Sequence, residues 1–376
     1  MKSKIPYLVL TLVAAVAAVA ATMAGATVTV LGSYKQVNLV ANTPGALHND
    51  ARMINPWGNA FLSGNPFWIN DEGSGVSELI DGQGNIFPGL PFVSVPKPPG
   101  ALGGSRPTGI VANGTASFAL KTGGPAFFIF ATLDGVIAGW NTGTNAVIVV
   151  NNSKTAQYTG LAMATISGKP FLYAANSIGG IDVFNGSFKP FKTLGGFVDP
   201  KPVPGMKPYN IANIDGFLFV TYEKLGEASG LVNKFKSDGT FIERFATGGT
   251  LNKPWGIALA SNNFGPAGNH LLIGNFGDGK ISVFQSPTNN ELLGLLGNTK
   301  GTALQIPGLW SLVVGDSAAG VTNPNNVYFT AGPDNQLDGL FGYIALSTTK
   351  VTPTATHTPT STRKATPTAT ATYVPY

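Results

Sequence analysis

Short phrases return about every fifty residues along the chain, and this repeat constrains the fold more than any other feature. The phrase Asn-Pro-Trp-Gly at residues 55–58 recurs in related form at residues 106–109, 158–162, 207–210, 253–256 and 306–310. The alignment sets Leu309 of the last phrase against Gly58 of the first. A repeat of this length is typical of solenoids, propellers and arrays. The repeat predicts an architecture but does not indicate a reaction.

Each repeat contains short apolar runs separated by turn residues. Examples of the three successive runs are residues 257–260, 217–222 and 281–284. Such runs, rich in β-branched and aromatic residues, predict strands. Asp-Gly and Asn-Gly pairs between them suit turns that need a positive φ. Three visible strands and a weaker fourth make one blade, so the prediction is an all-β chain forming a six-bladed β-propeller of four-stranded blades.

A propeller must close its ring, and the two ends of the repeat region indicate how. Residues 36–40 form a strand ahead of the first repeat, whereas the last repeat ends at residues 340–344 with its third strand. We expect the N-terminal strand to pair with the last blade as its outer strand, which protects edges that would otherwise pair with other chains. A β-sandwich array is the structural alternative.

The first 26 residues resemble a signal peptide. Lys2 and Lys4 form a basic start, residues 5–21 are almost entirely apolar, and Ala24 and Ala26 mark a small-x-small cleavage site. We therefore expect an exported protein, secreted or at the cell surface, with no membrane span after cleavage. An uncleaved anchor helix is the alternative, because the apolar stretch is nearly long enough to span a bilayer.

The composition changes completely after the propeller, which we assign to residues 27–348. Residues 351–376 contain ten threonines and four prolines, and such tracts behave as extended stalks. Residues 349–376 are therefore predicted to be a disordered Thr/Pro-rich tail or stalk. As a spacer it would hold the propeller away from a surface; the alternative is a disordered end without a role.

Charge and cysteine content exclude several classes of function. Five of the 23 basic residues lie in the signal or the tail, and the remaining 18 match the 18 acidic residues. A neutral propeller gives no case for nucleic-acid binding. The chain has no cysteine, which excludes thiolate metal sites and a Cys nucleophile. We expect a monomer that relies on its apolar core.

No catalytic constellation is visible, so the sequence assigns no catalytic residue and leans against an enzyme. A Ser/His/Asp triad needs a histidine near a nucleophile, and only His48 and His270 lie in the domain. No Gly-x-Ser-x-Gly motif is present. The acidic residues lie mostly in turns, and no pair of carboxylates suits glycoside hydrolysis.

Polar residues follow several of the predicted second strands, where the chain emerges at one face: Asn70, Asp71, Asn176, Asn275 and Asp278. If they converge near the axis, they form a ligand site, and Asn275 and Asp278 are the candidates for Ca²⁺ or another divalent ion, which prefers oxygen ligands. The alternative is that residues 274–279 form a tight turn whose Asn and Asp bond their own backbone.

Trp57, Trp255 and Trp310 recur at one point of the repeat. Bulky aromatic residues there can wedge between neighbouring blades and form core. Alternatively they form a ring at the channel mouth that stacks on sugars or other flat ligands. The neighbouring glycines allow close backbone approach in either case.

The motifs at residues 55–58, 253–256, 274–279, 308–310 and 339–342 together resemble a family of exported, mostly bacterial proteins of unknown function, distantly like NHL-type six-bladed propellers. The resemblance covers roughly residues 35 to 345. Several members carry a Pro-Glu-Pro type sorting signal, whereas this chain has a Thr/Pro tail instead. The resemblance implies a fold and a compartment, and no established chemistry.

Three functions remain open from the sequence. The first is an extracellular or cell-surface binding or scaffold module for a glycan or a protein. The second is a metal-dependent hydrolase similar to lactonase-like propellers, which hold a divalent ion in the central channel. The third is a structural envelope component. The low acid content favours binding over hydrolysis.

Overall fold

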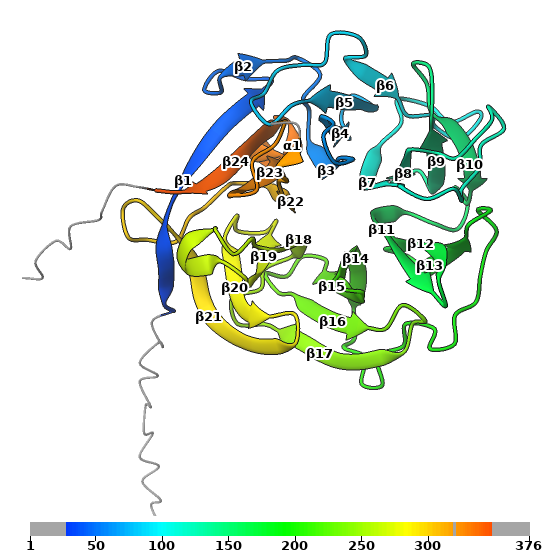
Figure 1. The fold of residues 1–376 in the computed structure, drawn as a ribbon. Coiled ribbons are helices and arrows are strands. Elements are labelled where there is room, and N and C mark those ends of the chain that lie inside the picture. The colour runs from blue at the N-terminus through cyan, green and yellow to red at the C-terminus, as the bar shows by residue number, and fades with distance from the viewer. Residues whose placement is uncertain (1–27, 319–320, 348–376) are drawn as a thin grey trace, which may run out of the picture.

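The structure is a computed structural model that describes residues 28–318 and 321–347 (Figure 1). The predicted signal peptide and the Thr/Pro-rich tail lie outside the described residues. Strands dominate the described chain, and its helical elements include η1 (Gly265–Ala267) and α1 (Pro333–Gln336), each a single turn. The all-β prediction is therefore confirmed.

Four successive repeats each form a separate antiparallel sheet. The first contains β3 (Pro56–Ala60), β4 (Phe67–Asp71), β5 (Val76–Ile80) and β6 (Phe92–Ser94). The second contains β7 (Pro107–Ala112), β8 (Phe128–Thr132), β9 (Val136–Trp140) and β10 (Val147–Asn151). The third has three strands where the sequence predicted four: β11 (Tyr158–Ile166), β12 (Lys169–Asn176) and β13 (Gly180–Asn185). The fourth contains β14 (Met206–Ile214), β15 (Phe217–Lys224), β16 (Leu231–Phe235) and β17 (Phe241–Thr247).

The last two repeats share one nine-stranded sheet. One half contains β18 (Pro254–Leu259), β19 (Leu271–Asn275), β20 (Ile281–Ser286) and β21 (Asn289–Asn298). The other contains β22 (Leu309–Val314), β23 (Asn326–Ala331), β24 (Leu340–Leu346), β1 (Val30–Ala41) and the short β2 (His48–Asn49).

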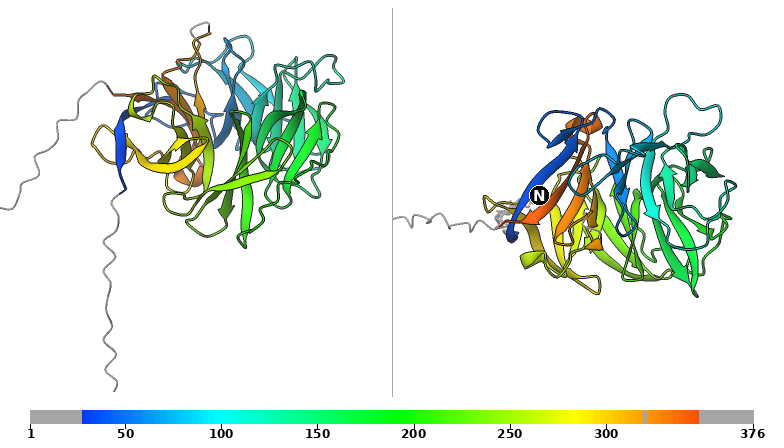
Figure 2. Two further views of the ribbon diagram at one scale, coloured as in Figure 1. Left: turned by 60° about the horizontal axis from the view of Figure 1, so that its bottom comes forward. Right: turned by 45° about the horizontal axis from the view of Figure 1, so that its top comes forward.

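The N-terminal strand β1 joins these two halves. It pairs antiparallel with β24, from Tyr34 opposite Leu346 to Ala41 opposite Leu340, as the sequence predicts (Figure 2). Its first residues also pair in parallel with β21. The 12-residue strand is long enough for one part to bond each neighbour. This double pairing, which the sequence did not predict, merges the two sheets.

The first strand of each repeat lies at the centre of the molecule (Figure 1). Strands β3, β7, β11, β14, β18 and β22 contact one another in that order, and β22 contacts β3. Glycines permit this close approach. A Cβ on Gly109 would lie 2.4 Å from the backbone nitrogen of Leu161, and one on Gly160 would lie 2.1 Å from Oδ1 of Asn210. The inner strands therefore form a ring.

Apolar side chains fill the space between neighbouring sheets. Strand residues alternate between the two faces of a sheet, so each sheet presents one set to the sheet before it and another to the sheet after it. Trp68 of β4, for example, stacks on Phe128 of β8 with ring centroids 4.3 Å apart. The core is thus a set of layers around the inner ring.

Candidate functional site

Four aromatic residues close the centre of the ring at one end. Trp57, Tyr209, Trp255 and Trp310 occupy the same place in β3, β14, β18 and β22, and each is at most 5% exposed. Trp57 stacks on Trp310 with centroids 3.7 Å apart and meets Trp255 edge-on at 6.2 Å. We call these four residues the aromatic plug. Beside them, Phe276 stacks on Trp310 at 4.1 Å.

Hydrogen bonds tie the plug to neighbouring strands. The indole N–H of Trp310 donates to Oδ1 of Asn55 at 2.9 Å, and that of Trp255 donates to the Thr159 carbonyl at 3.0 Å. Thr108 and Thr159 take the aromatic residue's place in β7 and β11. Four large rings and two small side chains therefore fill the axis together. The three tryptophans lie in the interior, and Trp255 also lines the space beside the plug.

The structure corrects the alignment of the last repeat. Trp310, rather than an earlier residue of its phrase, takes the place of Trp57, so Ser311 and not Leu309 corresponds to Gly58. Gly58 and Ser311 both line the space next to the plug. Leu309 lies in the apolar core instead. In the phrase Gly-Leu-Trp the residue before the aromatic is leucine, whereas it is proline at Trp57, Tyr209 and Trp255.

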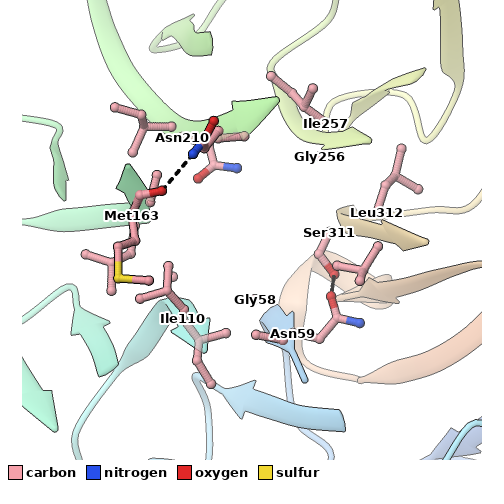
Figure 3. Close-up of a pocket in the computed structure, with 18 of the residues that line it drawn as sticks. Gly58, Asn59, Ile110, Met163, Asn210, Gly256, Ile257, Ser311 and Leu312 are labelled. Atoms are coloured by element: carbon pink, nitrogen blue, oxygen red, sulfur yellow. Dashed lines mark hydrogen bonds between the residues drawn. The ribbon is translucent and has the colours of Figure 1, made fainter. Parts of the chain in front are cut away.

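A channel of about 420 Å³ runs along the axis from the plug (Figure 3). All six inner strands contribute to its wall. Phe61 and Met163, which are half-buried, and Asn213, which is exposed, mark its open end. The plug closes the other end, so the channel is a blind pocket of the size that small ligands occupy.

The channel wall is apolar with a few uncharged polar groups. Its polar side chains are those of Asn59, Asn210, Asn213 and Ser311, and the described lining contains no Asp, Glu, Lys, Arg or His. Ser311 donates to Oδ1 of Asn59 at 2.7 Å, and Asn213 donates to the Met163 carbonyl at 2.9 Å (Figure 3). This wall can bind through hydrogen bonds and apolar contact. General acid–base chemistry needs a titratable group within hydrogen-bond reach.

Sequence reasoning missed these polar channel residues. Asn59 and Ser311 each come directly after a repeated phrase, and Asn210 is the last residue of another. Their signal is their position, one or two residues after the recurring aromatic residue of an inner strand.

The predicted Asn and Asp set does not gather at the channel. Asn70 donates to the carbonyls of Thr108 and Gly109, both at 3.1 Å. Asn275 accepts from the backbone N–H of Asn252 at 3.0 Å and donates to the Thr250 carbonyl at 2.9 Å. Both amides therefore tie the end of a second strand to neighbouring backbone.

Asn176 and Asp278 lie at two further places. Asn176 accepts from the backbone N–H of Gln157 at 3.1 Å and donates to Asp182 at 3.2 Å. Asp278 accepts from the backbone N–H of Lys280 at 3.2 Å, in the tight turn that was the alternative for residues 274–279. Within residues 28–318 and 321–347, no group of three or more His, Cys, Asp or Glu side chains could hold a metal ion.

Asp71 belongs to a buried acidic cluster, which we define as Asp50, Arg52, Asp71 and Glu78. Arg52 lies 2.6 Å from Oδ2 of Asp50 and 2.8 Å from Oε1 of Glu78. Both oxygens of Asp71 are buried without a hydrogen-bond partner. Pro56 pairs with Asp71 across β3 and β4, so the cluster lies at the plug end of the ring. Sequence reasoning missed its other members, although Glu78 inside the apolar strand β5 was a visible signal.

The electrostatics of this acidic cluster are unbalanced, because three carboxyl groups share one guanidinium. Burial raises the pKa of Asp71 well above its usual range, and the charges of Glu78 and Asp50 add to the rise. Burial and then the charge of Asp50 raise the pKa of Glu78 to about 7. The cluster therefore holds a proton near neutral pH.

The fold and the channel together define a β-propeller-type protein with a blind axial pocket. No protein-family model matches the chain. The uncharacterised protein R648 of Acanthamoeba polyphaga mimivirus is 32% identical over 338 residues, which cover 83% of this chain and 80% of that protein. The uncharacterised protein L690 of the same virus is 30% identical over 322 residues, with 79% and 81% covered. The chain belongs to the family of these mimivirus proteins.

A solved structure supports the fold. The soluble aldose sugar dehydrogenase of Escherichia coli, in its apo form, matches with a TM-score of 0.52 at 12% identity, over 84% of this chain and 100% of that one. At this identity the likeness concerns the fold alone, which is of the β-propeller type. The curated relatives are viral, so they give no support to the bacterial origin that the motif resemblance implied. No helix among the described residues is long and apolar enough to cross a membrane.

Proposed function

We propose that the protein is a binding module whose blind axial channel takes a small uncharged ligand, such as the terminal sugar of a neutral glycan. The observation that carries this proposal is a channel wall with uncharged hydrogen-bonding side chains and no charged side chain in its described lining. A charged ligand would lose its hydration there without gaining an opposite charge, which is costly. A neutral ligand meets no such penalty.

The proposal includes six blades, one for each inner strand. The ring of six inner strands supports this count. The nine-stranded sheet then represents two blades, with β1 as the outer strand of the sixth. We also assign the chain to the motif family of exported propellers that its phrases resemble.

We further propose that the protein is exported and acts as a monomer outside the cell or at its surface. Residues 1–26 support export through their basic start, apolar stretch and cleavage site. The Thr/Pro-rich composition of residues 349–376 suits a stalk between the propeller and a surface. Comparison of the secreted and cell-associated fractions after expression tests this part directly.

No observation favours the lactonase-like alternative. Its candidate oxygen ligands bond local backbone or neighbouring side chains at separate places, and the channel lining lacks an acid or a base. The binding proposal predicts no turnover of a lactone by the purified protein, with or without added Ca²⁺. Turnover that follows added metal would contradict it.

Thermal unfolding of the full chain tests binding. A ligand that binds only the folded state raises its stability, by about 2.7 kcal/mol at a concentration of 100 Kd. The test compares glucose, galactose and N-acetylglucosamine with the charged sugars glucuronate and glucosamine. We expect the melting temperature to rise only with the neutral sugars. Equal shifts with charged and neutral sugars, or no shift with any of them, would contradict the proposal.

A matched pair of variants locates the site. Met163→Trp places a large ring at the open end of the channel and should abolish the shift. Leu225→Trp places the same ring on the surface, where the native side chain is 86% exposed, and should leave the shift intact. A shift that survives Met163→Trp would place the ligand elsewhere.

A further inference from the structure

The third sheet lacks the outer strand that completes the other repeats. Its order is β11-β12-β13, whereas the second and fourth sheets each carry a fourth strand, β10 and β17. Among the described strands, none pairs with the outer side of β13. Strand β13 is therefore an edge at the outer rim of the ring (Figure 1).

Part of this edge presents free backbone groups. The Val183 carbonyl accepts from the N–H of Phe191 at 2.8 Å, and the N–H of Asn185 donates to the Lys189 carbonyl at 2.9 Å. Residues 183 and 185 thus face outward, and the alternation of an antiparallel ladder turns Ile181 outward as well. Residues 189–191 cover the second half of β13 only. The first half, from Gly180 to Asp182, remains open.

A groove lies along this open half. It has a volume of about 740 Å³, larger than the axial channel. Ile181, Asp182 and Val183 form part of one side, and Thr193 and Gly196 of the following loop also line it. Thr193 is buried, and the Gly195 N–H donates to the Asp238 carbonyl at 2.9 Å. The loop is thus held against the fourth sheet, beside the groove.

Large apolar side chains are exposed around the groove. Phe191 lines it with 41% of its surface exposed, and Leu194, between two lining residues, is 89% exposed. Ile178, two residues before β13, is 55% exposed, and Val198 is 64% exposed. Burying such surface on a partner is favourable at about 25 cal/mol per Å². The open edge therefore coincides with a local concentration of apolar surface.

The charge of this region is positive. Lys189 and Lys192 are exposed, and neither forms an ion pair with any residue in the described part of the chain. The nearby carboxylate of Asp182 accepts from Tyr158 Oη at 2.9 Å and from Asn176 Nδ2 at 3.2 Å, so internal donors engage it. The unpaired charge at the edge thus favours an acidic partner.

These lysines also oppose pairing between two copies of this chain. A second copy would bring the same unpaired positive charge to the edge, and like charges brought close together repel. Charged residues on edges protect natural sheets from such self-association. The charge thus selects a different chain as the occupant.

We propose that the open edge of β13 binds an extended acidic peptide segment of a partner protein, which adds to the sheet as its fourth strand. In strand addition, main-chain hydrogen bonds supply affinity and alternate side chains supply specificity. Here Ile181 offers its N–H and carbonyl, the exposed apolar residues meet the apolar side chains of the peptide, and the lysines meet its carboxylates. This site is independent of the axial channel.

The test uses the full chain and a blocked seven-residue peptide of alternating Glu and Val. We expect it to bind and to slow hydrogen exchange at the Ile181 amide, while the amides of β9, which β10 already covers, stay unchanged. A peptide with Pro in place of the central Val loses a backbone donor, and one with Lys in place of Glu reverses the charge. Each should bind at least tenfold more weakly.

Protein variants separate the charge from the fold. The double variant Lys189→Glu/Lys192→Glu should weaken binding of the Glu/Val peptide at least tenfold with little change in melting temperature. The control Lys300→Glu removes an exposed lysine in the turn after β21 and should leave binding unchanged. The proposal is overturned if the Glu/Val peptide fails to bind at millimolar concentration, or if it binds without protecting Ile181. Slow exchange at Ile181 in the free chain would also overturn it, because the chain itself would then cover the edge.

Discussion

The two ends of the axial channel use the same six inner strands for different purposes. At one end, four aromatic rings fill the axis and are almost fully buried. At the other, small and aliphatic side chains leave a pocket of about 420 Å³. Along each inner strand, the packed plug end and the open pocket lie only a few residues apart. One repeated phrase thus both stabilises the ring and forms the floor of the pocket.

The largest expected effect comes from opening the plug. Trp310→Ala removes the stacking on Trp57 and Phe276 and the hydrogen bond to Asn55. We expect a loss of about 3–5 kcal/mol in the free energy of unfolding, the usual cost of deleting a buried tryptophan. Urea denaturation measures it. Trp140→Ala, at a half-buried position on β9, is the control and should lower the free energy of unfolding less. Equal losses in the two variants would show that the plug contributes no more to stability than an ordinary aromatic residue.

A second effect distinguishes the ends by charge, since the buried acidic cluster lies at the plug end. The raised pKa values of Asp71 and Glu78 mean that the folded state binds more protons than the unfolded state above about pH 4.5. This stability is fully present below the unfolded pKa and is lost as pH rises through the folded pKa, about 7 for Glu78. We expect the free energy of unfolding to fall by about 1.4 kcal/mol per pH unit while one extra proton is released.

Variants assign this pH dependence. Asp71→Asn removes one carboxyl group from the cluster, so the decline in unfolding free energy between pH 5 and pH 8 should flatten. Glu291→Gln removes an exposed carboxylate and should leave the decline as it is. Urea titrations at several pH values provide the readout. An unchanged slope in Asp71→Asn would show that the cluster does not hold the proton.

A third effect concerns the spacing of the inner strands, on which both ends depend. A Cβ on Gly109 would lie 2.4 Å from the Leu161 nitrogen and 2.7 Å from the Gly160 carbonyl carbon. Because both are backbone atoms, they can make room for a Cβ only if β7 and β11 move apart. We expect Gly109→Ala to cost about 1–3 kcal/mol, as overpacking does. Gly114→Ala, where a Cβ meets nothing within 4 Å, is the control; equal costs would contradict strand contact as the cause.

Local patterns in the sequence were sufficient to predict the strands and the closing pair. The predicted run at residues 67–71 is β4 (Phe67–Asp71), and the strand at residues 36–40 lies within β1 and pairs with β24. Alternation and turn residues encode such elements locally. The second pairing of β1, with β21, depends on how two sheets curve toward each other in space. No local sequence pattern encodes this second pairing.

The candidate site was harder to predict from the sequence. The three tryptophans were correctly identified as one recurring position. The sequence does not show whether their rings line the mouth of the channel or fill the centre of the ring. Asp71 was selected as a possible ligand, whereas its partners Asp50 and Arg52 come from the segment before β3. Their approach depends on tertiary packing. The missing outer strand beside β13 is likewise visible only once the sheets are assembled.

The smallest expected effect on stability lies at the open end. Met163 is half-buried there and packs only in part against the neighbouring core, so Met163→Ala should cost about 1 kcal/mol. The same change widens the channel and removes apolar contact, so the melting shift produced by a neutral sugar should fall. Paired urea and ligand titrations separate the two quantities. A loss of stability comparable to that of Trp310→Ala would mean that the open end is packed like the plug, and the contrast between the two ends would disappear.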